Sequence, residues 1–258
     1  MFKNILLHGF SHNRKFFQPL TANLTKNTSY EFDAIDLPGR GNAPYYQNSK
    51  EYNYGNYIEY VKDYIKDEKI NIIGTSMGGL IAILLAEKYP HQINKIILND
   101  IGTFISKSAI LNVGKFIGQD MTHPDLQAMT QRILREFSGS AISKDEADFL
   151  VNAYVIEKNN KYSLNYDAKI ADAFWRNCRQ KKIPDMDFTQ NLENSINANP
   201  EIEIFLIRGE NSQFFTQDHF LQLSNKQYVK GSLLVKNKAH PPLLNSRSEF
   251  EIIESWIS

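Results

Sequence analysis

The feature that most constrains the fold of this chain is a tight turn at residues 74–78, Gly-Thr-Ser-Met-Gly, which joins two apolar segments. Residues 70–73 have the pattern of a short buried strand, and residues 79–86 are apolar throughout and predict a buried helix. Where a strand passes directly into a helix, the residue at the turn is strained and the segments on either side of it lie very close together. The residues two positions before and after the turn residue must therefore be very small. Gly74 and Gly78 meet this requirement. Without this context, a serine that caps a helix after a glycine turn would be the simpler interpretation.

Short apolar runs alternate with helical patterns along most of the chain, which is typical of a mostly parallel sheet covered by helices on both faces. About six strands are expected, at residues 4–7, 31–37, 70–73, 95–98, 202–208 and 232–235. Helices are expected near residues 53–65, 76–89, 216–223 and 247–256. The sequence therefore predicts an α/β fold.

This alternation stops between about Gly102 and Met186, where apolar residues have helical spacing and no convincing strand is found. We interpret residues 103–190 as a helical cap, or lid, inserted between two parts of an α/β core at residues 1–102 and 191–258. Several cap side chains are candidates to line an acyl pocket, although most are expected to pack the cap helices together: Phe104, Ile105, Phe116, Met121, Met129, Phe137, Phe174 and Trp175.

Charge and composition exclude several kinds of partner. Lys+Arg and Asp+Glu number 29 each, so no net field attracts nucleic acid or anionic lipid, and 42% hydrophobic residues are enough for a sizeable core. The single cysteine, Cys178, excludes an internal disulfide and fits a reducing compartment. The apolar runs are too short for a signal peptide or a membrane span. We therefore expect a cytoplasmic protein that binds a small molecule, with no nucleic acid and no membrane partner.

A second motif, Leu-Leu-His-Gly-Phe at residues 6–10, lies at the end of the first expected strand. An enzyme that transfers an acyl group needs two N–H donors aimed at the oxyanion, and loss of one donor costs about 3–4 kcal/mol. We expect these donors to be the backbone N–H groups of Phe10 and of Met77, which directly follows the turn serine. Gly9 lets the first loop approach closely. Taken alone, this motif would be an ordinary turn at the end of a strand.

A third motif, Ala-His-Pro-Pro at residues 239–242, lies between the last expected strand and the last helix. A general base must come from a loop beside the nucleophile, and in this kind of fold it comes last in the order serine, acid, histidine. Only His240 is placed in this way, so we expect it to be the base for Ser76. His8 is expected to support the oxyanion loop without transferring protons. The other histidines are expected to be solvated: His12, His91, His123 and His219.

Together these motifs resemble those of α/β-hydrolase-fold carboxylesterases and related serine hydrolases. The matching segments are residues 6–10, 36–41, 74–80, 99–102, 208–210 and 239–241. The resemblance covers residues 3–257, with the cap matching least. It implies a lid over the site and a Ser-His-acid triad with no metal or organic cofactor. Residues 36–41 look like a structural loop of the family, so Arg40 is not expected to be catalytic.

The chain departs from the family pattern in two places. The family usually opens with an antiparallel hairpin before the His-Gly loop, and this chain has no room for one. The strand at residues 31–37 would then lie at the edge of the sheet, where a homodimer or a contact with the lid is a candidate to cover it. Relatives also usually place an aspartate three or four residues after the glycine that corresponds to Gly209. Here Ser212 and Gln213 occupy those positions, and neither is a carboxylate.

The absence of that aspartate directs attention to Asp100, at the end of the preceding strand, where some family members carry their acid. Asp100 satisfies the chain order, and an acid is needed to hold the imidazole in the correct tautomer. Glu210 and Asp218 are alternatives, as is a dyad without an acid. A helix-capping role at the entrance to the cap is the structural alternative for Asp100.

The sequence thus favours a serine hydrolase that cleaves a small carboxylic ester through an acyl-enzyme, with catalytic Ser76, His240 and Asp100 and an oxyanion hole at Phe10 and Met77. The same fold also serves C–C bond hydrolases, lyases and cofactor-free oxygenases in which a histidine acts as the base. A non-catalytic ligand-binding homologue is a third alternative, supported by the missing acid after Gly209. Neither the substrate nor the oligomeric state follows from the sequence.

Overall fold

A computed structural model describes residues 2–27, 30–119, 121–179 and 184–258, with the side chain of Cys178 outside the described part. Six parallel strands form the central sheet in the order β11-β10-β4-β3-β1-β2. The strands are β1 (Lys3–Leu7), β2 (Phe32–Ile35), β3 (Ile70–Thr75), β4 (Ile93–Asn99), β10 (Glu203–Gly209) and β11 (Val229–Val235). The prediction of a mostly parallel sheet of about six strands is confirmed.

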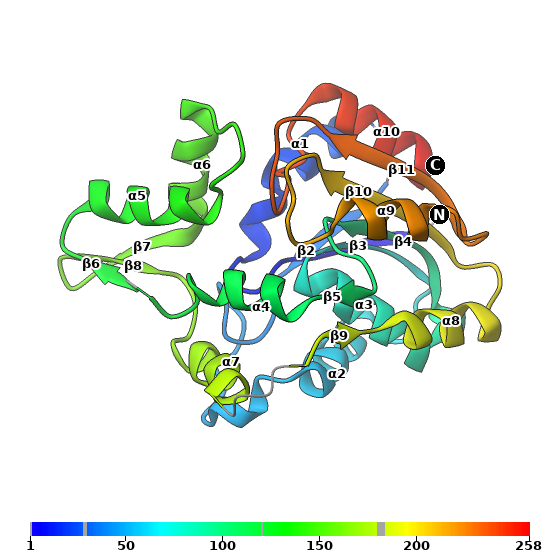
Figure 1. The fold of residues 1–258 in the computed structure, drawn as a ribbon, viewed down its shortest axis with the longest axis horizontal. Helices are drawn as coiled ribbons and strands as arrows, with labels where there is room; N and C mark the ends of the chain where they lie inside the picture. The colour runs from blue at the N-terminus through cyan, green and yellow to red at the C-terminus, as the bar shows by residue number, and fades with distance from the viewer. Residues whose placement is uncertain (1, 28–29, 120, 180–183) are drawn as a thin grey trace.

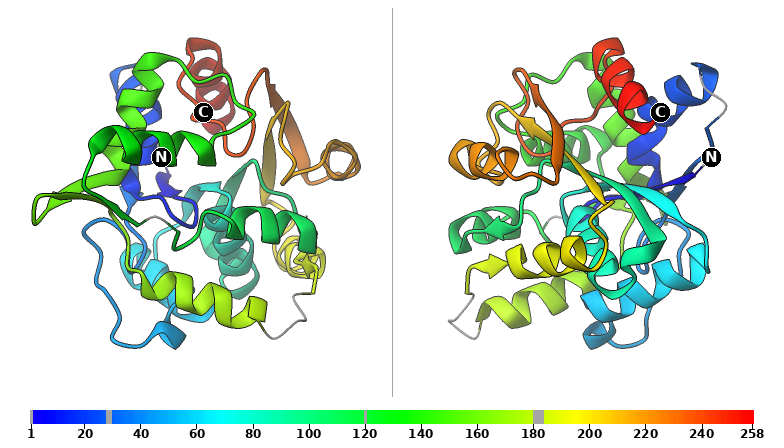
Figure 2. Two further views of the ribbon diagram at one scale, coloured as in Figure 1. Left: turned by 60° about the vertical axis from the view of Figure 1, so that its left-hand side comes forward. Right: turned by 90° about the vertical axis from the view of Figure 1, so that its right-hand side faces the viewer.

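Helices cover both faces of this sheet (Figures 1 and 2). On one face α1 packs against α10, and on the other α3 packs against α2, α8 and the strand β3, while α9 contacts β10 and β11. The helices of the core are α1 (Gln18–Asn27), α2 (Tyr54–Ile65), α3 (Met77–Lys88), α8 (Thr189–Ala198), α9 (Gln217–Ser224) and α10 (Arg247–Ile257). Of these, α3 is buried on nearly all sides because its residues are almost all apolar. None of the helices in the described ranges is both long and apolar enough to cross a lipid bilayer.

The strand β2 lies at one edge of the sheet, as predicted, and pairs only with β1 within the described residues. It has only four residues, and short strands protect an edge against pairing with other chains. In this strand the Asp33 carboxylate accepts a hydrogen bond from the Tyr64 hydroxyl and forms an ion pair with Lys3. A homodimer that covers this edge stays a prediction.

The segment between β4 and α8 lies beyond the carboxyl ends of the sheet strands (Figure 1). It contains the helices α4 (Lys107–Gly114), α5 (Leu126–Glu136), α6 (Lys144–Tyr154) and α7 (Lys169–Arg179). It also contains the short strands β5 (Phe104–Ile105), β6 (Thr122–His123), β7 (Val155–Lys158), β8 (Lys161–Leu164) and β9 (Met186–Asp187). The expectation that this segment holds no strand is therefore wrong.

The strands were missed because they are only two to four residues long. In β7 and β8, Lys158 pairs with Lys161 across a two-residue loop, Asn159-Asn160. Both loop residues have positive φ, 53° and 55°, which asparagine tolerates better than most residues and which tight hairpin turns require. The signal for this hairpin was thus present in a stretch whose Asn and Lys content makes it look like a loop.

The two ends of the segment lie side by side. The strand β5 pairs antiparallel with β9, and next to this pair the Phe188 N–H donates to the Thr103 carbonyl at 2.7 Å. The hydroxyls of Thr103 and Thr189 are also 2.9 Å apart. An insertion into a core needs its entry and exit to be adjacent in this way. That residues 103–190 form a separate cap stays a prediction, and we use the name cap for this range below.

Candidate active site

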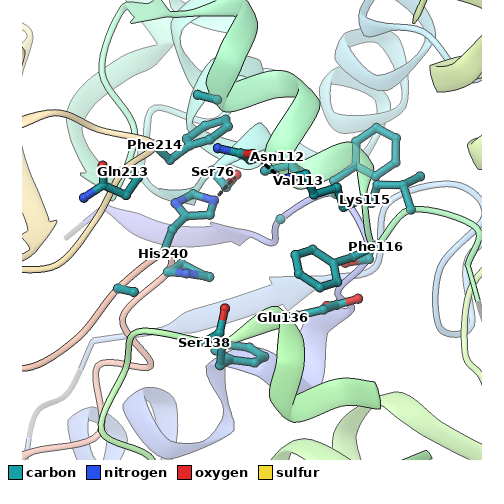
Figure 3. Close-up of a pocket in the computed structure, with 18 of the residues that line it drawn as sticks. Ser76, Asn112, Val113, Lys115, Phe116, Glu136, Ser138, Gln213, Phe214 and His240 are labelled. Atoms are coloured by element: carbon teal, nitrogen blue, oxygen red, sulfur yellow. Dashed lines mark hydrogen bonds between the residues drawn. The ribbon is translucent and has the colours of Figure 1, made fainter. Parts of the chain in front are cut away.

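Ser76 lies at the turn between β3 and α3 with φ 51° and ψ −119°, a backbone conformation that non-glycine residues rarely adopt. The two glycines allow the turn to close. A Cβ atom at Gly78 would lie 2.0 Å from the Leu7 carbonyl oxygen, and one at Gly74 would lie 2.5 Å from the Cα of Gly79. The strained turn predicted from the sequence is therefore present, and the Ser76 side chain lies at a cavity (Figure 3).

Ser76, His240 and Asp100 form one line of hydrogen bonds. The distance from Ser76 Oγ to His240 Nε2 is 2.9 Å, and His240 Nδ1 is 2.7 Å from Asp100 Oδ2. Because a carboxylate only accepts hydrogen bonds, the imidazole carries its proton on Nδ1 and presents the Nε2 lone pair to the serine. Asp100 is fully buried and His240 is partly exposed. The three side chains come from the ends of β3 and β4 and from the loop after β11.

Asp100 is held from several sides at the junction of β4 and β10. Its own N–H donates to the Ile207 carbonyl at 2.8 Å. Its Oδ1 accepts the Gly209 N–H at 2.8 Å, and its Oδ2 accepts the Ser212 hydroxyl at 2.7 Å. These donors, together with His240 Nδ1, give both oxygens of the buried carboxylate hydrogen-bond partners.

The alternative acids lie elsewhere. Glu210 is exposed and accepts the Asn237 N–H through Oε2 at 2.9 Å, and Asp218 is exposed on α9. Within the described residues, Asp100 is the carboxylate that contacts His240. Ser212, which sequence reasoning treated only as the replacement of an acid, contributes a hydroxyl to the acid on the neighbouring strand.

The loop that carries Phe10 is anchored by His8. Its Nε2 accepts the Leu37 N–H at 2.9 Å, so the proton sits on Nδ1, which lies 2.8 Å from the Gly9 carbonyl. Burial, with a contribution from the nearby Arg40 charge, lowers the pKa of His8 to about 3. His8 is therefore neutral at physiological pH, as its expected supporting role requires.

Arg40 contacts both residues whose backbone N–H groups are expected to bind an oxyanion. The guanidinium is fully buried, and Nε donates to the Phe10 carbonyl at 2.8 Å. Its Nη2 lies 3.8 Å from Met77 Sδ, and its Nη1 donates to the Tyr57 hydroxyl at 2.6 Å. Met77 is the first residue of α3, where a backbone N–H has no acceptor within the helix. Sequence reasoning set Arg40 aside as structural and missed that it orients this loop.

One of the four histidines predicted to be solvated is buried. His12 is 6% exposed and stacks on the rings of Phe16 and Tyr154, with ring centroids 5.1 and 4.9 Å away. Burial lowers the pKa of His12 to about 3. The prediction is wrong here because the flat imidazole stacks between Phe16 of the core and Tyr154 of the cap, and the second of these contacts is not visible in the local sequence.

Two cavities meet at Ser76, with volumes of about 310 and 260 Å³. Phe10, Val113 and Phe214 line both of them together with Ser76. Of the aromatic and apolar cap residues proposed for a pocket, Phe116 and Phe137 line the larger cavity, and Ile105 and Phe174 line the smaller one. The other four line neither: Phe104, Met121, Met129 and Trp175. Within the described residues, no three His, Cys, Asp or Glu side chains are grouped as metal ligands.

The serine on the strand–helix turn is hydrogen-bonded to a histidine, and the histidine is hydrogen-bonded to a buried aspartate. Together with the α/β sheet, this arrangement places the chain in the class of α/β folds that resemble serine hydrolases. The family model described as alpha/beta hydrolase fold matches residues 5–240, and the chain belongs to this family. A crystal structure of a putative hydrolase from Rickettsia typhi is 26% identical, with a TM-score of 0.83 over 99% of this chain and 86% of that one. A hydrolase of E-2-(acetamidomethylene)succinate is 15% identical with a TM-score of 0.81, covers 99% and 91% of the two chains, and supports the fold alone.

Characterised relatives match over shorter segments. A pimeloyl-[acyl-carrier protein] methyl ester esterase of Neisseria meningitidis is 33% identical over 99 residues, or 37% of this chain and 35% of that protein. A 3-hydroxybutyrate-oligomer hydrolase of Cupriavidus necator is 28% identical over 117 residues, or 44% and 39% of the two chains. A serine hydrolase-like protein of Danio rerio is 29% identical over 181 residues, or 64% and 55%. The chain thus spans between about a third and just over half of the length of these relatives.

Proposed function

We propose that this α/β-hydrolase is a carboxylic ester hydrolase that works through an acyl-enzyme on Ser76. The observation that supports this most directly is the hydrogen-bonded line from Ser76 through His240 to Asp100, which ends at the meeting point of two cavities. Distant relatives named as esterases point to the same chemistry.

In the proposed mechanism, Ser76 Oγ attacks the ester carbonyl carbon while His240 Nε2 accepts the hydroxyl proton. The carbonyl oxygen becomes an oxyanion that accepts hydrogen bonds from the N–H groups of Phe10 and Met77. The bond between the carbonyl carbon and the alcohol oxygen then breaks, and the alcohol leaves with the proton from His240. A water molecule repeats these steps on the acyl-enzyme and releases the carboxylic acid. Asp100 holds the imidazole in the required tautomer throughout and stabilises its charged form.

Asp100 also answers the main argument for a non-catalytic homologue, which was the missing acid after Gly209. It supplies a buried carboxylate to His240 from the adjacent strand. For proton-abstracting lyases and oxygenases, a nucleophilic serine is not needed, whereas ester hydrolysis by this route requires one.

A fluorophosphonate probe and a set of p-nitrophenyl esters test the proposal. We expect the native protein to be labelled covalently and to hydrolyse the esters, and Ser76→Ala to lose both properties. Ser248→Ala, at an exposed serine on α10 that lines neither cavity, serves as the matched control that keeps its label and its activity. Ester hydrolysis that persists in Ser76→Ala, or a native protein that is neither labelled nor active, would contradict the proposal.

A further inference from the structure

The two cavities at Ser76 differ in chemical character, and this difference constrains the substrate. The smaller cavity, which we call the apolar cavity, is bounded by the core helices α2 and α3 and the cap helices α4 and α7. The larger one, which we call the polar cavity, extends from His240 to the cap residues around Glu136 (Figure 3). Ser76 lies where they join, so a bound ester would send one of its two arms into each.

The apolar cavity offers little to a polar group. Its wall includes Met77, Leu80, Ile110 and Phe174. It also includes tyrosines whose hydroxyls are already engaged: Tyr52 donates to Asp167 at 2.6 Å, and Tyr57 accepts from Arg40 at 2.6 Å. These tyrosines therefore contribute mainly their rings. Since an apolar cavity of about 150 Å³ holds benzene, we expect one of 260 Å³ to hold a group of up to about ten carbon atoms.

The polar cavity has more hydrogen-bonding groups in its wall than the apolar cavity, beside apolar side chains such as Phe116 and Phe137. Six of them surround its cap and loop side: Asn112, Lys115, Glu136, Ser138, Asn211 and Gln213. Figure 3 shows Asn112, Glu136 and Ser138 around the space that Ser76 and His240 also face. His12 adds a buried neutral imidazole, and its Nδ1 has no hydrogen-bond partner among the described residues. Buried polar atoms are normally hydrogen-bonded, so an unpartnered one in a cavity wall favours a polar occupant.

The position of His240 decides which arm of the ester enters which cavity. His240 lines the polar cavity and not the apolar one, whereas Met77 lines only the apolar one. The leaving alcohol must take its proton from His240 Nε2, so it has to lie on the side of His240. The acyl group then extends in the other direction, past Met77.

On this basis, and resting on the proposed ester hydrolysis, we propose that the substrate is a partial ester of a small polyol with an apolar acid of up to about ten carbons. The acyl chain occupies the apolar cavity, and the hydroxyls of the alcohol bind in the polar cavity. A glycerol monoester is the simplest molecule with this chemistry.

A matched pair of esters tests the alcohol side in the native protein. Glycerol 1-monohexanoate and propyl hexanoate have the same acyl chain and the same three-carbon alcohol backbone, and they differ by two hydroxyls. We expect kcat/KM to be at least about tenfold higher for the glycerol ester, because its hydroxyls can hydrogen-bond to the cavity wall, whereas the propyl ester leaves the buried His12 Nδ1 without a partner. Gln213→Leu should reduce this ratio at least about threefold, since Gln213 lines the polar cavity. The exposed Gln217 lines neither cavity, and Gln217→Leu should leave the ratio unchanged.

A second pair of variants tests the acyl side. Ile110 and Leu111 are neighbours on α4, but only Ile110 lines the apolar cavity, and Leu111 is 38% exposed. Ile110→Phe should lower kcat/KM for octanoyl esters at least about tenfold while acetyl esters change less than about threefold, because the added ring fills the cavity. Leu111→Phe should change neither. Ala173→Leu narrows the same cavity from α7 and gives an independent reading if Ile110→Phe folds poorly.

Three results would overturn the proposal. One is equal kcat/KM for the glycerol and propyl esters, which would remove the polyol. Another is an Ile110→Phe or Ala173→Leu protein that changes the preference for the alcohol and leaves the acyl preference intact, which would reverse the two arms. The third is a native protein whose kcat/KM is highest for acetyl esters, with a chain-length preference that neither Ile110→Phe nor Ala173→Leu changes. Failure of ester hydrolysis itself appears differently, as a native protein that cleaves none of these esters and binds no fluorophosphonate.

Discussion

At the scale of single residues, the carboxylate that faces His240 comes from the strand next to the one suggested by the family resemblance. Asp100 follows β4, and Ser212 follows β10, yet their side chains are within one hydrogen bond because these strands are neighbours in the sheet. Asp100 could be predicted because Ser212 and Gln213 cannot be carboxylates. The hydrogen bond from Ser212 could not be predicted, since it depends on the register of two strands far apart in the sequence.

Asp100→Asn is expected to lower kcat at least about a hundredfold, because an amide favours the wrong imidazole tautomer while it preserves shape. Glu210→Gln and Asp218→Asn are matched controls, since both residues are exposed, and each should stay within about tenfold of the native kcat. Steady-state kinetics on one ester measures all three. If Asp100→Asn retains native activity and Glu210→Gln or Asp218→Asn is impaired, another carboxylate serves His240.

The contact between Ser212 and Asp100 predicts a rescue. Because Ser212 Oγ lies 2.7 Å from the carboxylate oxygen that contacts His240, an acid at position 212 would reach the same region. Ser212→Asp added to Asp100→Asn should recover about tenfold or more of the lost kcat. Ser212→Asn in the same background is the control, since it adds similar volume without charge. Equal activity of the two double variants would show that position 212 cannot orient the imidazole.

At the scale of elements, the loop that carries His240 is fastened to the cap. Lys238 Nζ donates to Glu146 and to the Ala141 carbonyl, both at 2.6 Å. The Ala239 N–H donates to Ser140 Oγ at 2.7 Å, immediately before the histidine. The position of the His240 imidazole is thus coupled to the packing of α6 (Lys144–Tyr154), the helix that contains Glu146.

This attachment should be sensitive to acid. Burial raises the pKa of Glu146, but hydrogen bonds from Lys238, the Ser143 backbone and Asn245 outweigh that effect and hold the pKa below its usual value. A lowered pKa stabilises the folded state above the pKa of the unfolded chain, about 4.3, and this contribution is lost as the pH falls through the folded value. We therefore expect Glu146→Gln to lower the free energy of unfolding by about 1–3 kcal/mol at pH 7 and by progressively less below pH 4.

Urea unfolding at several pH values measures this difference. Glu157→Gln, an exposed substitution on β7 of the cap, is the matched control and should behave like the native protein at each pH. A Glu146→Gln deficit that stays constant down to pH 3 would mean that the carboxylate charge does not stabilise the attachment.

How well an element could be predicted depends on how it is buried. The strand β3 was predicted closely because its residues are all buried and three of its first four are isoleucines, with Asn71 as the polar exception. In contrast, β11 was predicted only from residue 232, although it begins at Val229. It is an edge strand whose side chains are more exposed and alternate in burial, so the polar Lys230 and Gly231 masked its start. The strands of the cap were missed because they are shorter still, with two to four residues each.

At the scale of the whole molecule, the core and the cap differ in how their backbone is protected. Parallel strands such as β1, β3 and β4 are buried on both faces beneath helices. The cap instead contains an antiparallel sheet of three short strands, of which β7 is mostly exposed, and helices of eight to eleven residues. Its adjacent ends at β5 and β9 leave it joined to the core through a narrow region of chain.

Native-state hydrogen exchange should resolve this difference. Segments with fewer buried contacts open at lower free energy than the core, as cooperative units. We expect the amides of α5, α6 and β6-β8-β7 to exchange through a common opening at least about 2 kcal/mol below the global free energy of unfolding, and those of β1, β3, β4 and β10 to exchange only through global unfolding. A fluorophosphonate bound to Ser76 fills the space beside Phe116 and Phe137, so it should slow exchange in the cap more than in the core. If cap and core amides exchange with one common free energy, residues 103–190 are an integral part of a single cooperative domain.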